Sequence, residues 1–193
     1  MDSDALIDLL LESATLKRML RTGWAMRGVA HVESVADHSY GVAFLALALV
    51  DWLNGADGAQ PLDLEKALAI AVLHDAGEVR LTDLPSSASQ LLPEGVKRQA
   101  ELDAVGDLLV PLPGAGRWRA LWLEFEDGTS PEGRLIRDAD KLEMMVQCLR
   151  YEQAGSRGLE EFWQAMDRRD WHYPLCRALY ESLKARRPGN GEA

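Results

Sequence analysis

The chain has 193 residues, of which 47% are hydrophobic; this suits one folded domain with a sizeable core and excludes a disordered chain. Its formal net charge of −10 excludes bulk attraction to duplex nucleic acid, so an anionic ligand needs a local cation. The acidic N-terminal stretch lacks the features of a signal peptide, and the longest strongly apolar run, residues 41–50, is too short to cross a bilayer. We therefore expect a soluble, cytoplasmic protein with no membrane partner, and reduced thiols at Cys148 and Cys176.

Apolar positions recur at helical spacing along almost the whole chain. A first helix is expected from Ser3 to about Leu20, followed by an irregular connection over residues 21–33. Ser34–Asp37 fits a capping box, and the helix that it opens should run to about Asn54, apolar nearly all round and therefore central. Further helices are expected from the cap Asp63 to about Val79, and over about 96–109, 117–126, 131–152, 158–166 and 173–185.

Neither strand alternation nor an internal repeat is present. The sequence thus predicts an all-α fold: a single globular helical bundle of roughly seven to nine helices over residues 1–185. Residues 186–193 are expected to form a disordered tail.

Polar side chains end the helix that is expected from Asp63 to Val79. Its apolar face extends to Ala71, and helical spacing places His74, Asp75 and Glu78 on the same face. Burying these groups without partners would be costly, and a bound metal ion would satisfy them. The alternative is a helix end that is simply solvated.

His38 stands in the first turn of the most apolar helix that the sequence predicts. Its alternative role is that of a core histidine bonded to a carbonyl, whereas His31 and His172 are expected to be surface or local packing residues. In "RLIRDADKLEMM", Asp138 and Asp140 flank an apolar stripe on opposite sides, so the spacing does not choose which of them turns inward.

Three segments, "ESVADHSYGVA", "LHDAGEVRLTDLP" and "RDADKLE", resemble the signatures of the HD-domain metal-dependent phosphohydrolases. The resemblance is closest to the 5'-deoxynucleotidase branch and its eukaryotic HD-domain-containing relatives, and it covers about residues 16–152. It implies an HD-domain helical bundle, a homodimer and one divalent metal ion. The metal ligands that it implies are His38, His74, Asp75 and Asp140.

The same resemblance assigns Glu78 to the hydrolytic water or the leaving group, and Asp83 to the sugar. It places Leu84, Pro85 and Ser86 beside the sugar and makes Trp24 an aromatic wall that disfavours a 2'-hydroxyl. In the bacterial enzymes an arginine that orients the phosphate directly precedes this tryptophan, whereas Gly23 stands there in this chain. Arg21 or Arg27 would then take the role from a shifted position.

Two imidazoles and two carboxylates suit Co²⁺, Mn²⁺, Mg²⁺ or Fe²⁺ better than a closed zinc site. We expect a metal-dependent phosphomonoester hydrolase acting on deoxyribonucleoside 5'-monophosphates. One alternative is a hydrolase of another nucleotide phosphoester, such as a triphosphate or an alarmone. The other is a non-catalytic, metal-stabilised nucleotide-binding module.

Overall fold

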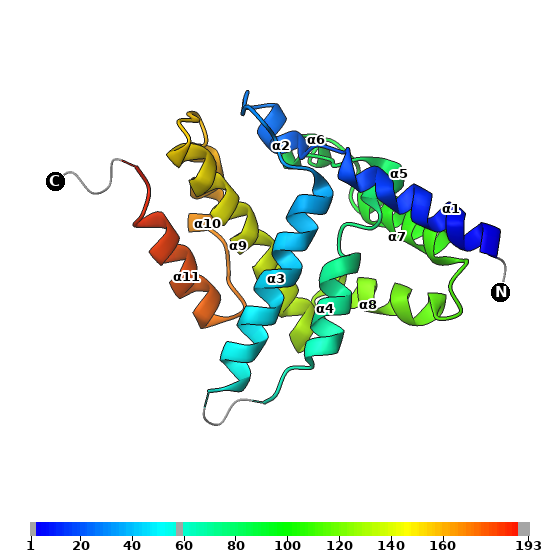
Figure 1. Cartoon of the computed structure of the whole chain (residues 1–193). Coiled ribbons are helices and arrows are strands. Elements are labelled where there is room, and N and C mark those ends of the chain that lie inside the picture. Colours follow the sequence, from blue (N-terminus) through cyan, green and yellow to red (C-terminus); the bar gives the residue numbers. More distant parts are fainter. Residues whose placement is uncertain (1–2, 57–59, 189–193) are drawn as a thin grey trace.

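The computed structural model describes residues 3–56 and 60–188, and their regular structure is helical apart from one isolated β-bridge between Leu20 and Ser34 (Figure 1). Eight of the helices in these residues have eight residues or more, which agrees with the seven to nine expected, and the all-α fold is confirmed. The elements are α1 (Ser3–Ser13), the 3₁₀ turn η1 (Ala14–Lys17), α2 (Thr22–Ala25), α3 (Val35–Asn54), α4 (Leu64–Leu73), α5 (Glu78–Leu81), α6 (Ser86–Ser89), α7 (Val96–Leu109), α8 (Ala115–Asp127), α9 (Pro131–Gln153), α10 (Glu160–Asp167) and α11 (Pro174–Lys184).

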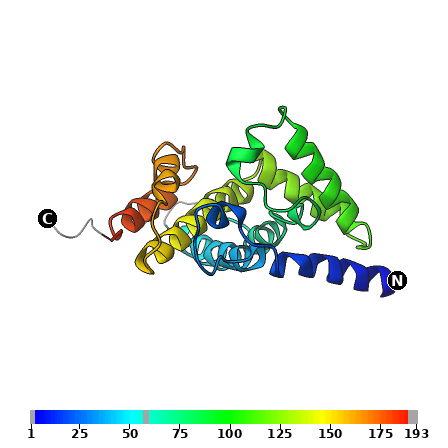
Figure 2. The ribbon, with the colours of Figure 1, turned by 90° about the horizontal axis from the view of Figure 1, so that it is seen from above.

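The two longest helices, α3 and α9, cross at the centre of the molecule, with α4 beside them (Figure 1). Their facing side chains, among them Val42, Ala46, Leu135 and Leu142, are almost completely buried in the main core. A second apolar cluster joins α5, α7 and α8 around Val105 and Trp122. Both views place α1 at the rim, and Figure 2 separates the α7–α8 side from the α10–α11 side of the molecule.

Local capping explains where the central helices begin. The Ser34 side chain accepts the Asp37 N–H, and the Asp37 carboxylate accepts the Ser34 N–H, so the expected capping box is confirmed. Ser130 likewise caps α9, with Pro131 at its first position. These capped helices carry two side chains of interest, His38 in the first turn of α3 and Asp140 near the middle of α9.

The expectation of one helix from Asp63 to Val79 is wrong, because the chain leaves the α-helix after Leu73 and resumes it at Glu78. The His74 carbonyl accepts the Trp122 indole N–H at 3.2 Å, while the Glu78 N–H goes to the Asp75 carbonyl. A Cβ at Gly77 would lie 3.2 Å from the Cβ of Glu101. Packing against α7 and α8 therefore stabilises a tight turn at residues where the sequence pattern predicted a continuous helix.

The first helix also ends earlier than expected, since α1 stops at Ser13 and η1 at Lys17. The following residues pair with the approach to α3: the Met19 carbonyl accepts the Val35 N–H, and the Glu33 carbonyl accepts the Arg21 N–H. This pairing fixes the start of α2 beside the start of α3.

Helix α3 is central, but it is not covered all round. Tyr40, Phe44 and Leu47 are exposed on its outer side, where Tyr40 and Phe44 stack with ring centroids 6.5 Å apart, and Trp52 is exposed further round the helix. We call Tyr40, Phe44 and Leu47 the outer α3 face. Helix α3 is therefore apolar on two sides, one that is buried in the core and one that is exposed.

Residue 186 was expected to begin a disordered tail, yet Arg187 pairs with Glu152 and Glu160, and residues 189–193 lie outside the described residues. None of the helices in the described part of the chain has the length and apolar character that crossing a bilayer requires.

Candidate active site

His38, His74 and Asp75 converge at the point where α3 meets the turn after α4. Their ligand atoms all lie within 4.8 Å of one another. The Nε2 atoms of the two histidines are 3.4 Å apart. Asp75 Oδ2 lies 3.2 Å from His74 Nε2 and 3.7 Å from His38 Nε2. His38 comes from α3, whereas His74 and Asp75 stand directly after the last residue of α4.

Asp140 joins this cluster from α9, with Oδ1 3.3 Å from His38 Nε2 and Oδ2 2.9 Å from Lys141 Nζ. Asp138 turns the other way: its carboxylate accepts the Tyr173 N–H at 2.9 Å and pairs with Arg169 at 3.3 Å. Of the two aspartates between which the sequence pattern did not choose, Asp140 faces the histidines and Asp138 holds the start of α11.

The cluster fits a cation. Asp75 Oδ2 is buried and accepts no hydrogen bond within the described residues. Burial alone would raise the pKa of Asp75, but His74, Arg21 and His38 outweigh it and hold the pKa well below its usual range. Burial acts in the same way on Asp140, whose pKa Lys141 and His38 nevertheless keep low. Two ionised carboxylates beside two imidazole nitrogens are a donor set for a divalent metal ion.

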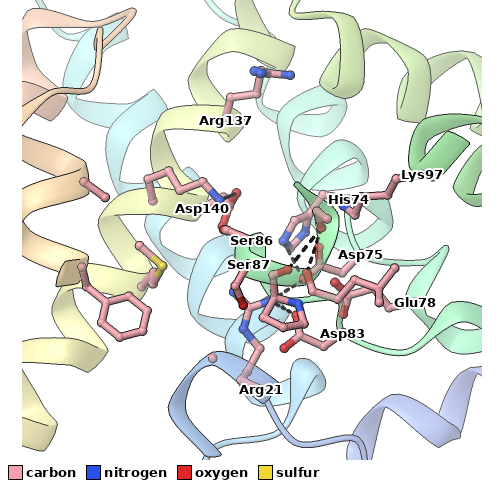
Figure 3. A pocket seen from close by; sticks show the side chains of 18 of the residues that line it. Arg21, His74, Asp75, Glu78, Asp83, Ser86, Ser87, Lys97, Arg137 and Asp140 are labelled. Atoms are coloured by element: carbon pink, nitrogen blue, oxygen red, sulfur yellow. Dashed lines mark hydrogen bonds and ion pairs between the residues drawn. The ribbon is translucent and has the colours of Figure 1, made fainter. Parts of the chain in front are cut away.

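Arg21 lies between the cluster and Asp83 (Figure 3). Its Nη1 atom is 3.3 Å from Asp83 Oδ1 and 3.6 Å from Asp75 Oδ2. The other Asp83 oxygen accepts the Thr22 N–H, and the Asp83 carbonyl accepts the Thr22 hydroxyl at 2.8 Å. Arg27 instead pairs with Glu161. The structure thus brings Arg21, not Arg27, to the cluster. Asp83 holds the start of α2 through its contacts with Arg21 and Thr22.

Glu78 lies at the start of α5, beside Asp75 and Asp83 (Figure 3). Its Oε2 atom is buried without a hydrogen-bond partner in the described residues. Burial, followed by the charges of Asp75 and Asp83, raises the pKa of Glu78 to about 9. At neutral pH this carboxyl group holds a proton beside the cluster.

A cavity of about 830 Å³ opens over the cluster. Trp24, 2% exposed, forms part of its wall; its indole N–H donates to Glu33 Oε1 at 2.8 Å, and its ring packs against Phe162 with centroids 4.3 Å apart. Leu84, Pro85 and Ser86 also line the cavity. The expected substrate residues therefore border one cavity, although Asp83 faces the protein's own backbone.

Sequence reasoning missed two carboxylates behind the cluster. Glu143 Oε2 lies 2.5 Å from His38 Nδ1, and Glu33 completes a second group of close donor atoms with His38 and Glu143. Burial, then the Glu143 charge, raises the pKa of Glu33 to about 7. The spacing of Glu143, three residues after Asp140, was the available signal, because such side chains share a helical face.

Comparison with known proteins gives a family-model match to the HD domain over residues 13–172. The chain is 30% identical to "5'-deoxynucleotidase HDDC2" of Danio rerio, over 95% of this chain and 88% of that one. It is 32% identical to the protein of the same name from Dictyostelium discoideum, over 89% and 93% of the two chains.

Among solved structures, PH0347 protein from Pyrococcus horikoshii OT3 is 38% identical with a TM-score of 0.77, over 93% of this chain and 97% of that one. A conserved hypothetical protein from Pyrococcus furiosus is 40% identical with a TM-score of 0.75, over 93% and 98%. The family match covers most of the chain, and the chain therefore belongs to the HD-domain family of metal-dependent phosphohydrolases.

Proposed function

We propose that this protein is a metal-dependent phosphomonoester hydrolase that converts deoxyribonucleoside 5'-monophosphates into deoxynucleoside and phosphate. The observation that carries the proposal is the convergence of His38, His74 and Asp75 at the base of a cavity, with Arg21 beside them. Relatives named 5'-deoxynucleotidase, similar over most of the chain, support this substrate class.

His38, His74, Asp75 and Asp140 would hold one divalent ion, and their mixed nitrogen and oxygen donors suit Co²⁺, Mn²⁺, Mg²⁺ or Fe²⁺. When bound, such an ion polarises a phosphoryl oxygen and lowers the pKa of water. It also offsets the negative charge of the site, which would otherwise repel a phosphate.

The chain's own side chains orient the phosphate and move the proton. The Arg21 guanidinium can turn from Asp75 and Asp83 to pair with phosphate oxygens. Glu78 would donate a proton to the O5' atom as the P–O5' bond breaks and the oxygen of water joins phosphorus, and the proton that this water loses would return the carboxylate to its acid form. Both groups border the same cavity, which the reaction requires.

Trp24 supplies the wall against which the deoxyribose would lie. Its ring is fixed by Glu33, Tyr151 and Phe162, so it cannot swing away to admit an added 2'-hydroxyl. Leu84, Pro85 and Ser86, which line the same cavity, would border the sugar as well.

A monophosphate fits this cavity better than a triphosphate or an alarmone. Arg21 contacts Asp75 of the cluster, and its one guanidinium can neutralise only one phosphate group. Lys97, Lys141 and Arg137 also border the cavity, where Lys97 pairs with Glu101, Lys141 pairs with Asp140, and Arg137 donates to the Phe125 and Glu126 carbonyls.

The proposal includes a homodimer formed through the outer α3 face. Residues 40, 44 and 47 are spaced by four and three, the spacing by which helices pack along a seam. Phe44→Glu would turn the dimer into a monomer in light scattering; a variant as dimeric as the wild type would exclude this face.

A cytoplasmic location is also part of the proposal. Both cysteines are free and buried, as expected of thiols in a reducing compartment.

A phosphate-release assay tests the function. Purified protein with each of the four ions would receive deoxyribo- and ribonucleoside 5'-mono- and triphosphates. The proposal requires deoxyribonucleoside monophosphates to react fastest and Glu78→Gln to be at least about a hundredfold slower. Faster triphosphate turnover would favour the alternative esterase, and binding without turnover would favour a nucleotide-binding module.

A further inference from the structure

His38 uses both of its ring nitrogens. Nε2 faces the cluster, within 3.3 Å of Asp140 Oδ1 and 3.7 Å of Asp75 Oδ2. Nδ1 faces the opposite way, 2.5 Å from Glu143 Oε2. A carboxylate only accepts, so a ring whose Nε2 binds an ion would keep its one proton on Nδ1, where Glu143 accepts it.

The two histidines of the cluster are oriented by different groups. His74 Nδ1 lies 2.7 Å from the Ala71 carbonyl oxygen, a backbone acceptor of its own helix. His38 has no such backbone acceptor at Nδ1 in the described structure, where Glu143 takes that place. The orientation of His38 therefore depends on a side chain that mutation can remove without altering the backbone.

Gly41 provides the space for this contact. It lies inside α3, one turn beyond His38, where glycine is among the least favourable residues for a helix. A Cβ at position 41 would lie 2.5 Å from Glu143 Oε1, 2.8 Å from its Cγ and 2.9 Å from its Cδ. The body of the Glu143 side chain, not only its tip, thus occupies the space of a side chain at this position.

Helix α9 supplies both partners of the His38 ring. Asp140 and Glu143 are three residues apart on α9 and therefore share a face. One contacts Nε2 and the other contacts Nδ1. The ring is thereby held between two carboxylates of one rigid helix.

We propose that Glu143 is a positioning residue, which holds His38 in the tautomer and orientation that present Nε2 to the metal ion, and that Gly41 is required so that Glu143 can reach it. Carboxylates behind histidine ligands have this role in other metal sites. The inference rests on the proposed metal-dependent function, and it concerns metal affinity rather than the substrate.

Titration with Mn²⁺ alone, with the free ion measured by electron paramagnetic resonance, tests the proposal in the full-length protein. The variants are Glu143→Gln, which removes the charge, and Gly41→Ala, which displaces the Glu143 side chain. Glu152→Gln is the matched carboxylate control, because Glu152 lies on the same helix and accepts the Trp163 indole N–H. Gly106→Ala is the matched glycine control, since its Cβ would meet only Arg119, at 3.7 Å.

We expect Glu143→Gln and Gly41→Ala to weaken Mn²⁺ binding about 10- to 100-fold, and both controls to bind like the wild type. The Mn²⁺ concentration that gives half-maximal phosphate release should rise by the same factor, and saturating Mn²⁺ should restore most of kcat. A purely structural defect would not be restored in this way. If Glu143→Gln does not fold, Gly41→Ala decides, because alanine favours the helix.

Affinities within twofold of the wild type for both variants would overturn the proposal, as would a wild-type protein that binds no Mn²⁺. Wild-type protein that binds Mn²⁺ but releases no phosphate would overturn the proposed function only. The Mn²⁺ affinities of the variants would still decide the role of Glu143.

Discussion

Glu78→Gln should change how the stability of the metal-free protein depends on pH. The substitution keeps the shape of a side chain that is 8% exposed and removes its titration. The pKa of Glu78 is raised from 4.5 to about 9, chiefly by burial and then by Asp75 and Asp83. Stability from the protonated group is fully present below the unfolded pKa and is lost as the pH rises towards the folded one.

The size of this effect follows from linkage. Between pH 5 and pH 8 the folded state holds one proton more than the unfolded state at Glu78, which corresponds to about 1.4 kcal/mol per pH unit. The free energy of unfolding of the wild type should therefore fall by about 4 kcal/mol relative to Glu78→Gln over this range. Other groups with shifted pKa values, such as His38 and Glu33, are present in both proteins, so the comparison isolates Glu78.

Urea denaturation at pH 5, 6, 7 and 8, in the presence of a chelator, measures this difference. Two stability curves that remain parallel from pH 5 to pH 8 would refute the reasoning and show that Glu78 is ionised in the folded protein. A wild type that gained stability relative to Glu78→Gln as the pH rose would also refute the reasoning.

Five further substitutions, two of them matched controls, test the other assignments. Arg21→Ala should raise KM at least about tenfold because it removes the charge-assisted contact to phosphate, whereas Arg27→Ala should not; equal effects would contradict the assignment to Arg21. Asp140→Asn should lower metal content in elemental analysis, while Asp138→Asn should leave it unchanged and lower the melting temperature; the reverse pattern would exchange the roles of the two aspartates. Trp24→Ala should lower the free energy of unfolding in urea by about 3 kcal/mol or more and reduce the ratio of activities on deoxyribo- and ribonucleotides; an unchanged ratio would show that Trp24 does not discriminate the sugar.

Sequence patterns predicted the helices whose ends are locally encoded. Ser34 with Asp37, and Ser130 with Pro131, are signals that depend on neighbouring residues alone, and α3 and α9 begin where these signals place them. Helix α7 likewise spans the expected residues 96–109.

The interruption after α4 was not predictable, because its causes are distant in the sequence. The Trp122 indole takes the His74 carbonyl, and Glu101 packs against Gly77. Helical periodicity nevertheless suggested that His74, Asp75 and Glu78 lie together. In the structure these residues are grouped at a turn, and the sequence pattern of a continuous helix does not distinguish a turn at this point from further helix.

Two further features needed the packing of whole helices. Spacing left Asp138 and Asp140 equivalent, and the structure separates them because Asp140 contacts His38 while Tyr173 and Arg169 contact Asp138. The exposure of Phe44 and its neighbours was missed for a similar reason: an apolar helix surface reads alike whether its own chain or a second copy covers it.

The central claim is that an ion held by this cluster is required for hydrolysis of a phosphomonoester. Phosphate release from a deoxyribonucleoside 5'-monophosphate, measured for wild type and Asp75→Asn with a chelator and after adding back Mn²⁺ or Co²⁺, tests it most directly. We expect the chelator to abolish wild-type turnover, the ion to restore it, and Asp75→Asn to remain at least about a hundredfold slower. Turnover that persists in the chelator, or an Asp75→Asn variant as active as the wild type, would contradict the claim.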